Sequence, residues 1–361
     1  MPSPPVPAKP RRRSDLLGRI GLVLASIVVA LLVLELALRA WSIEYLIKWP
    51  NFVLGARTVL AQRENSRFQD DPLLGYVPRP NYAVPGISFD SNGFRRTGTV
   101  PSPKRPILAV GDSYTYGDEV TDRETWPAQL QQRIGRPVLN AGVSGYGFDQ
   151  TVLRAEQEAE ATHPAVIVVS FIADDIRRTE MRRMWGAEKP YFDLQGDSLV
   201  LRNVPVPPRP DPRTTLTFWQ RTLGYSYLFD FVLHRLDLLY NWFGDHIRVL
   251  PPGRGQEIAC RLTEHLQALQ SRTGAPILMV AQYDPVVWQD PAFAAEQRRM
   301  TLGLLDCARR HDLAVLDTFD ALAATAGKDG PRGLYGRWHM NERGNDVIAQ
   351  LIATALPHKA H

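Results

Sequence analysis

The sequence is poor in the residues that metal sites and disulfide frameworks need. It contains only two cysteines, Cys260 and Cys307, and eight scattered histidines, with no HExxH motif and no paired CxxC motif. These absences exclude the common zinc-site patterns. The glycine-rich segments also lack the GxGxxG and GxxxxGKS/T patterns that hold phosphate groups. We therefore predict neither a metal nor a nucleotide cofactor.

Excess charge of one sign is confined to the N-terminal segment. The net charge of the chain is +4, and residues 9–19 alone supply it through one lysine and four arginines against Asp15. The remainder is neutral, so the sequence shows no sign of a nucleic-acid-binding surface. We expect no nucleic-acid partner.

A long apolar stretch follows the basic residues. Residues 20–34 carry no charge, and the apolar segment over 16–40 is long enough for one membrane span. The basic residues predict that the N-terminus, residues 1–15, is cytoplasmic and that everything after the span is extracytoplasmic. A cleaved signal peptide is the alternative, but no clear small-residue cleavage site follows the stretch. We expect a retained anchor in the inner (plasma) membrane and a periplasmic or extracytoplasmic domain.

The rest of the chain divides into a stalk and an α/β domain. Residues 41–105 are rich in proline, glycine and asparagine, and we expect a stalk that packs on the domain. Over 106–361 strands and helices alternate, which predicts a parallel sheet covered on both faces. An insertion at about 176–250 contains an expected hairpin around Gly196 and an amphipathic helix near 222–243. That helix could pack over the core, cover the active site or lie on the membrane. The expected strands are 106–110, 137–140, 165–171, 276–282 and 313–317, and the expected helices lie near 124–134, 148–161, 255–274, 291–310 and 341–355.

The two cysteines fall on expected helices that flank one strand. In an oxidising compartment Cys260 and Cys307 could form a disulfide. Two buried free thiols are the alternative, and the sequence does not decide between them.

A candidate nucleophile follows the first strand of the domain. The apolar run Ile107–Val110 leads directly into Gly111, Asp112 and Ser113. This order places a serine hydroxyl at the carboxyl end of a strand, where open α/β sheets keep their active sites. The glycine permits the sharp turn that aims the hydroxyl into a crevice.

A serine nucleophile needs a base and donors for the oxyanion. The candidate base is His339, which lies in a loop before the last expected helix. Candidate donors follow two other strands, in the glycine-rich segment 140–147 and in the segment 170–176. Four such features at successive strand ends predict one site at the carboxyl edge of the sheet.

These segments together resemble the SGNH (GDSL-type) hydrolase family. Gly111-Asp112-Ser113 resembles its first block, Gly142 its second, Ala173-Asp174-Asp175 its third and His339 its last. The resemblance implies a three-layer, flavodoxin-like α/β/α fold with a five-stranded parallel sheet. It also implies ester chemistry at Ser113 and an oxyanion hole made by Ser113, Gly142 and a third donor at Asp174.

The segments before the serine are similar to those of the membrane-anchored bacterial subgroup of this family. The similar residues are 71–76, Asp-Pro-Leu-Leu-Gly-Tyr, and 91–95, Ser-Asn-Gly-Phe-Arg.

Two positions depart from the family pattern. The third block usually supplies an asparagine N–H, whereas an ionised Asp174 cannot donate and would repel an oxyanion. The family also usually has an aspartate two or three residues before the histidine, and here Arg337 and Gly336 occupy those positions. Asp329 in the same loop, or a backbone carbonyl, could orient His339 instead.

The leading hypothesis is a membrane-anchored extracytoplasmic serine esterase. It would act on acyl esters, by family resemblance acetyl esters of cell-surface carbohydrate, through Ser113, His339 and a covalent acyl-enzyme. A carbohydrate O-acyltransferase and a lipid esterase could use the same site. A catalytically inactive domain that binds polysaccharide or a partner is the alternative outside enzymes.

Overall fold

A computed structural model describes residues 12–196, 198–209, 211, 213–236 and 238–357. These residues form two compact units. The N-terminal unit comprises residues up to 59 together with 211–243, and the α/β unit comprises 60–210 together with residues from 244 onward.

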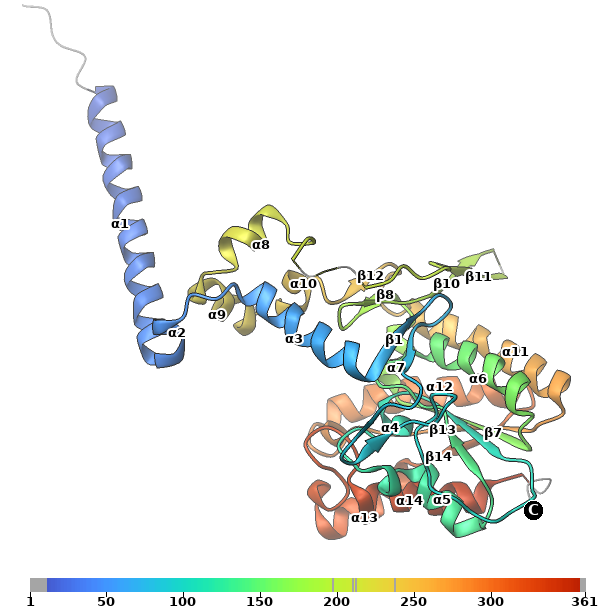
Figure 1. The fold of residues 1–361 in the computed structure, drawn as a ribbon. Coiled ribbons are helices and arrows are strands. Elements are labelled where there is room, and N and C mark those ends of the chain that lie inside the picture. The colour runs from blue at the N-terminus through green and yellow to red at the C-terminus, as the bar shows by residue number, and fades with distance from the viewer. Residues whose placement is uncertain (1–11, 197, 210, 212, 237, 358–361) are drawn as a thin grey trace, which may run out of the picture. The chain divides into compact units, whose positions relative to one another are not determined.

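The α/β unit is built on a five-stranded parallel sheet (Figure 1). The strand order is β14-β13-β7-β5-β6. The central strands β5 and β7 consist entirely of buried residues, as expected where helices cover both faces of a parallel sheet. The bounds are β5 Ile107–Val110, β6 Val138–Asn140, β7 Val166–Phe171, β13 Ile277–Ala281 and β14 Ala314–Asp317.

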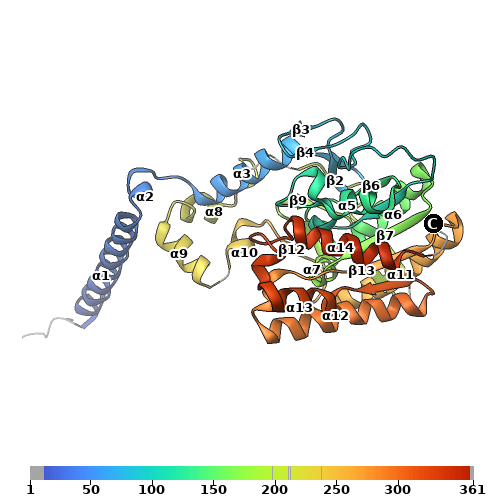
Figure 2. The same cartoon turned by 90° about the horizontal axis from the view of Figure 1, so that it is seen from below.

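Helices cover both faces of this sheet, as Figures 1 and 2 show. On one face α5 packs against α14, and on the other α11 packs against both α6 and α12. The three-layer α/β/α fold and the five expected strands are therefore confirmed. The helix bounds are α4 Ser113–Tyr116, α5 Trp126–Ile134, α6 Phe148–Thr162, α7 Ala173–Arg178, α11 Arg254–Thr273, α12 Pro291–Arg310, α13 Phe319–Asp329 and α14 Glu342–Ala355, with short 3-10 turns at Asp122–Glu124, Pro285–Trp288 and Pro331–Gly333.

Outside the parallel sheet, short antiparallel strands of the α/β unit form the pairs β1-β2, β3-β4 and β10-β11 and the three-stranded sheet β12-β8-β9. The hairpin expected around Gly196 is present, since β10 pairs with β11. Most of the expected stalk belongs to this unit, because residues from 60 onward cluster with it. The bounds are β1 Phe68–Asp71, β2 Gly75–Pro78, β3 Ala83–Val84, β4 Ile87–Ser88, β8 Met181–Met184, β9 Ala187–Glu188, β10 Tyr191–Gln195, β11 Ser198–Arg202 and β12 Ile247–Arg248.

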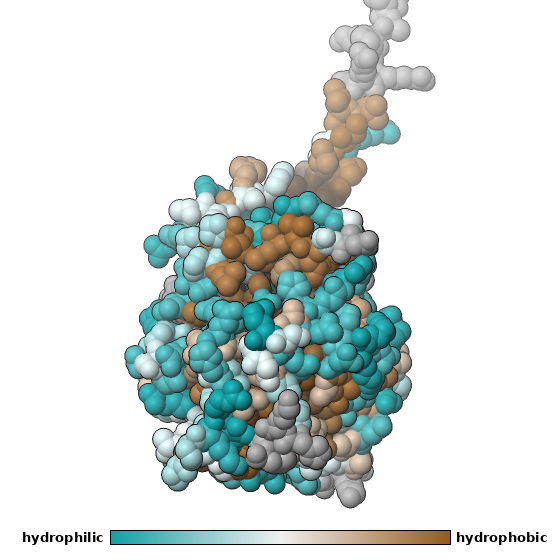
Figure 3. Space-filling view, turned by 90° about the vertical axis from the view of Figure 1, so that its right-hand side faces the viewer, coloured by the Kyte–Doolittle hydropathy of each residue, from teal (hydrophilic) through white to brown (hydrophobic). Residues whose placement is uncertain are grey.

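The N-terminal unit contains a long apolar helix. Helix α1 spans Arg12–Trp41, and its segment Leu16–Trp41 is long and apolar enough to cross a membrane. Its described surface is predominantly hydrophobic (Figure 3). The other helices are α2 Ile43–Ile47, α3 Phe52–Arg67, α8 Phe218–Leu223, α9 Tyr227–Arg235 and α10 Leu239–Phe243, and α3 continues into the α/β unit.

Two expectations about these segments were wrong. Helix α3 was not expected, because the composition of 41–105 as a whole concealed a proline-free run of helix-forming residues over 52–67. The single helix near 222–243 is instead divided. Gly224 ends α8, where a side chain would collide with Asn51 and the Gln220 carbonyl, and Ser226 begins α9 by accepting from the Phe229 N–H.

The two cysteines form a disulfide that joins two neighbouring helices. Cys260 of α11 and Cys307 of α12 are bonded, at a sequence separation of 47. The sequence left open whether these two cysteines are bonded or free thiols, and the structure shows them bonded.

We expect the double variant Cys260→Ser/Cys307→Ser to be less stable by about 2–4 kcal/mol, because a cross-link of this length restricts the unfolded chain. Urea unfolding of the full chain in detergent would measure this as a lower midpoint. An unchanged midpoint would show that the bond contributes nothing to stability. Oxidised wild-type protein treated with a reductant provides the matched comparison.

Candidate active site

Ser113 lies at the carboxyl end of β5, in the place that the sequence predicts. It is the first residue of α4, and Asp112 caps that helix by accepting from the Tyr114 N–H at 3.0 Å. Gly111 must be small, because a Cβ atom there would collide with Thr115 and the Ser170 carbonyl. The side chain of Ser113 is held at this edge and is 6 % exposed.

The structure brings His339 to Ser113. The distance from His339 Nε2 to Ser113 Oγ is 3.0 Å, within hydrogen-bond range. The Ser113 hydroxyl also donates to Asp112 Oδ2 at 3.2 Å. With Nε2 accepting, the arrangement suits proton transfer from the serine to the imidazole.

Glu119 is the acid that faces His339, and sequence reasoning missed it. Its Oε1 lies 3.6 Å from His339 Nδ1, longer than a hydrogen bond but close enough for an ion pair with an imidazolium. Nδ1 is buried and has no hydrogen-bond partner among the described atoms. A carboxylate in this position can orient the ring and stabilise its protonated form.

The same carboxylate also fixes the backbone of the histidine loop. Glu119 Oε2 accepts from the N–H groups of Arg337 at 2.7 Å and Trp338 at 3.2 Å. Gly336 must be small for this approach, because a Cβ atom there would lie 2.5 Å from Oε2. Burial alone would raise the pKa of Glu119, but these backbone hydrogen bonds and His339 outweigh it, and the pKa is lowered. Glu119 is therefore an anion at neutral pH.

Glu119 itself has an unusual backbone. Its φ is +69°, in the left-handed region that residues with a side chain rarely adopt. Such strain persists only where surrounding contacts over-determine it, and it is common at functional sites. The sequence signal was weak, because only its position six residues after Ser113 linked Glu119 to the motif.

Asp329, the acid expected from the sequence, is the last residue of α13. Its side chain lies outside those that the structure describes, so its proposed role as an orienting acid stays a prediction. Glu119 is the carboxylate that the described residues place opposite Nδ1.

Gly142 lies against the first turn of α4, and its expected role as an oxyanion donor stays a prediction. A Cβ atom on Gly142 would collide with the backbone of Thr115 and Tyr116, so only glycine permits this approach. Its N–H donates to Asn140 Oδ1 at 3.1 Å in this structure. To donate to an oxyanion, the Gly142 N–H must either give up its hydrogen bond to Asn140 or donate to both acceptors at once.

Asp174 is held by arginines. Its carboxylate lies 2.8 Å from Arg178 and 3.6 Å from Arg177. Burial would raise the pKa of Asp174, but the two guanidinium groups outweigh it and lower the pKa. An ionised carboxylate cannot donate a hydrogen bond, so the side chain of Asp174 does not supply the third oxyanion donor that the resemblance implies.

Arg178 connects the third block to the nucleophile motif. Besides Asp174, its guanidinium reaches Asp175 at 2.7 Å and Asp112 at 3.7 Å. Burial raises the pKa of both Asp112 and Asp175, and the cation between them opposes this rise. The arginine thus offsets the cost of burying carboxylates beside Ser113.

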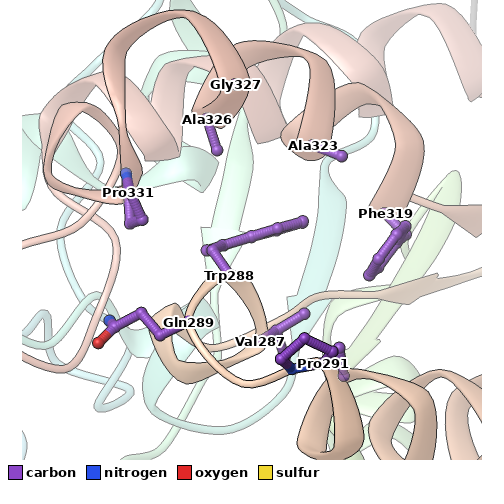
Figure 4. A pocket seen from close by; sticks show the side chains of 10 residues that line it. Val287, Trp288, Gln289, Pro291, Phe319, Ala323, Ala326, Gly327 and Pro331 are labelled. Carbon is purple, nitrogen blue, oxygen red and sulfur yellow. The ribbon is translucent and has the colours of Figure 1, made fainter.

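A cavity of about 450 Å³ lies near the carboxyl ends of β13 and β14. Its walls are mostly apolar, and Figure 4 shows Trp288 between the side chains of Ala326 and Val287. None of its lining residues is titratable, and Ser113 and His339 are not among them. Among the described residues, no group of three or more His, Cys, Asp or Glu side chains is arranged to hold a metal ion.

Comparison with known protein families identifies the family of the chain. A sequence model of the GDSL-like Lipase/Acylhydrolase family matches residues 109–347, well over half of the chain. No curated protein matches the chain.

Solved structures resemble the chain at low identity. LAE5, an alpha/beta hydrolase enzyme from the metagenome of Lake Arreo, is 16% identical with a TM-score of 0.44, over 72% of this chain and 96% of that one. A lipase/acylhydrolase from Enterococcus faecalis is 16% identical with a TM-score of 0.39, over 70% and 94%. A catalytic mutant of Axe2, an acetylxylan esterase from Geobacillus stearothermophilus, is 14% identical with a TM-score of 0.40, over 70% and 93%. On the match of the family model, the chain belongs to the GDSL-like lipase/acylhydrolase family and is a hydrolase of ester bonds.

Proposed function

We propose that this hydrolase is a membrane-anchored serine esterase that removes acetyl groups from carbohydrate outside the cytoplasmic membrane. The observation that carries the serine mechanism is the 3.0 Å contact between Ser113 Oγ and His339 Nε2 at the end of β5. Ser113 Oγ attacks the acyl carbon while its proton passes to Nε2. The ester C–O bond then breaks, and His339 returns the proton to the leaving alcohol oxygen.

Water completes the cycle. It attacks the acyl carbon of the acyl-enzyme, gives a proton to Nε2, and the proton passes back to Ser113 Oγ as the carboxylic acid leaves. The N–H groups of Ser113 and Gly142 would donate to the oxyanion of both tetrahedral intermediates. If a sugar hydroxyl replaced water in this second step, the acyl group would be transferred to that hydroxyl and the product would be an acylated sugar.

Neutralising Asp174 should increase turnover. A carboxylate near a developing oxyanion opposes it, although Arg177 and Arg178 compensate for part of this charge. We expect Asp174→Asn to raise kcat for an acetyl ester by up to about 10-fold, since it removes the charge and adds a donor. Asp174→Ala, which removes the charge without adding a donor, separates the two effects. A fall in kcat for Asp174→Asn would show that the carboxylate is needed.

An exposed tryptophan beside the histidine supports a carbohydrate substrate. The indole of Trp338 is 57 % exposed. Its backbone is fixed on both sides, because its N–H donates to Glu119 and its carbonyl accepts from the Tyr114 hydroxyl at 3.1 Å. The Arg337 guanidinium lies 5.5 Å from the centre of the indole ring. An exposed indole next to a polar site is suited to stacking against a sugar ring.

The test compares two acetyl esters on the purified full chain. We expect Trp338→Ala to raise KM for acetylated xylo-oligosaccharides by about 10-fold, because a stacking contact is worth about 1–2 kcal/mol. Turnover of ethyl acetate, which has no ring, should change little. Trp219→Ala, an exposed tryptophan of the N-terminal unit, is the matched control. Equal losses on both esters, or no acetate release from carbohydrate by wild type, would contradict the carbohydrate proposal.

The proposed location follows from α1. We propose that α1 stays in the inner membrane with residues 1–15 in the cytoplasm, because the basic residues precede the apolar segment. Accessibility of cysteines introduced at each end of α1 to a membrane-impermeant thiol reagent, in intact cells, tests this orientation.

A further inference from the structure

The last turns of α1 are built into the folded N-terminal unit rather than ending free. Glu35 of α1 accepts from the N–H groups of Tyr227 and Leu228, each at 2.8 Å, and from Ser226 Oγ at 2.9 Å. These groups form the N-terminus of α9, where the helix dipole favours an anion. A residue of the apolar helix thus caps a helix that lies almost 200 positions later in sequence.

Arg39, one turn after Glu35, completes this junction. Its Nε lies 2.5 Å from Glu35 Oε1, and it donates to the carbonyls of Tyr45, at 2.7 Å, Lys48 and Tyr225. Its guanidinium also lies 3.6 Å from the centre of the Trp49 ring. Arg39 is fully buried and Glu35 nearly so. Glu35 and Arg39 are paired with each other and with backbone groups inside the unit. Neither charge is therefore exposed to lipid, which would be unfavourable in free energy.

Part of the outer surface of this unit is an apolar groove. A groove of about 770 Å³ lies between α1 and the α8–α9 segment, with walls that include Val28, Leu32, Leu228 and Val232. Aromatic side chains nearby are also exposed, and Phe218 and Trp219 of α8 are 69 % and 63 % exposed. An apolar surface of this kind is costly in water.

The length of α1 places this groove at the height of the bilayer. Leu16 to Leu34 spans about 28 Å at 1.5 Å per residue, close to the roughly 30 Å of a hydrocarbon core. The α1 residues that line the groove, Val28 to Leu34, therefore fall within about the last 9 Å of that core. This depth is typical of helices that lie in a membrane interface.

We propose that α8 and α9 form an interfacial membrane element, and that acyl chains of membrane lipids fill the groove between them and α1. Glu35 and Arg39 hold this element against the end of the span. The element adds a second membrane contact from residues 211–243, far from the N-terminus. The inference rests on the proposed retention of α1 in the membrane and not on the ester chemistry.

The test measures depth in vesicles of palmitoyloleoyl phosphatidylcholine and phosphatidylglycerol that contain the full chain. Because the native cysteines are bonded to each other, a single new cysteine can be labelled with an environment-sensitive dye. The labelled variants are Trp219→Cys and Phe231→Cys in the element, Leu24→Cys in the span and Arg299→Cys on the exposed surface of α12. Lipids with a spin label on the acyl chain quench dyes within the hydrocarbon.

We expect strong quenching at positions 219, 231 and 24 and little at 299. Quenching at 24 with none at 219 and 231 would overturn the interfacial element while leaving the anchor intact. An absence of quenching at 24 as well would overturn the anchor, and with it this proposal, without bearing on ester hydrolysis.

A second variant tests the junction itself. Glu35→Ala removes the acceptor at the start of α9, so quenching at 231 should fall by at least half while quenching at 24 is unchanged. Glu35→Gln, which keeps an acceptor oxygen, should retain most of the quenching. Equal quenching at 231 in all three proteins would show that Glu35 does not hold the element at the membrane.

Discussion

Ser113→Ala should reduce ester hydrolysis by the full chain by about 10⁶-fold, the loss seen when a serine nucleophile is removed from a working serine–histidine pair. The hydroxyl that attacks the acyl carbon would be absent, so only the slow direct attack of water would remain. Acetate release from an aryl acetate, followed over hours, measures the residual rate. His339→Ala should cost a similar factor, and the double variant should be no worse than either single one, because the two groups act as a unit.

Ser144→Ala is the matched control for this change. Ser144 lies in the β6–α6 loop and donates to Asp118 at 2.5 Å, but it does not contact His339 in the described structure. It should retain most of the wild-type activity. If Ser113→Ala kept more than about a tenth of the wild-type rate, the covalent route through Ser113 would be excluded.

Glu119→Gln should lower kcat by about 10²–10⁴-fold with little change in KM. In a serine protease the loss of the orienting carboxylate costs about 10⁴ in kcat. The longer separation here, 3.6 Å between Glu119 Oε1 and His339 Nδ1, suggests a smaller loss. Glutamine keeps an oxygen that can accept from the Arg337 and Trp338 N–H groups, so the loop should keep its place while the negative charge is lost.

Two other acids serve as controls for Glu119→Gln. Asp118→Asn alters the neighbouring carboxylate, which bonds to Ser144 and not to His339. Asp329→Asn removes the acid that the sequence suggested. We expect both to keep kcat within about threefold of the wild-type value, as is usual for substitutions away from the reacting groups. A large loss for Asp329→Asn with none for Glu119→Gln would identify Asp329 as the orienting acid instead.

The fold was predictable because its central elements carry local signals. Strands β5 and β7 are continuous apolar runs, and such runs are typical of buried parallel strands whatever surrounds them. Ser113 and His339 were identified for a related reason, since each lies in a short motif at a strand end or before a helix. Parallel topology then brings such positions to one edge of the sheet.

Glu119 was missed because its role depends on tertiary contact. It lies 220 positions before His339. The sequence pattern points to an orienting acid only in the segment directly before the histidine. Nothing local distinguishes Glu119 from the neighbouring Asp118. Its function becomes visible only when three backbone N–H groups of the histidine loop are seen to point at its carboxylate.

The grouping of residues 211–243 with α1 was unpredictable for the same reason. The sequence shows Glu35 near the end of an apolar stretch, where an acid is tolerated at the membrane interface. That Glu35 caps α9 depends on contacts between segments about 190 residues apart. Asp174 is an intermediate case: the sequence showed that an ionised carboxylate would be a poor donor, and the structure adds the arginines that keep it ionised.

Covalent capture of the nucleophile tests most directly whether Ser113 attacks the ester. The full chain would be treated with a serine-reactive fluorophosphonate, and the adduct would be located by peptide mass spectrometry while ester turnover is followed. We predict one adduct per chain, on Ser113, with turnover falling in proportion to labelling and no adduct in Ser113→Ala. An adduct on another residue, or full turnover by completely labelled protein, would show that Ser113 is not the nucleophile.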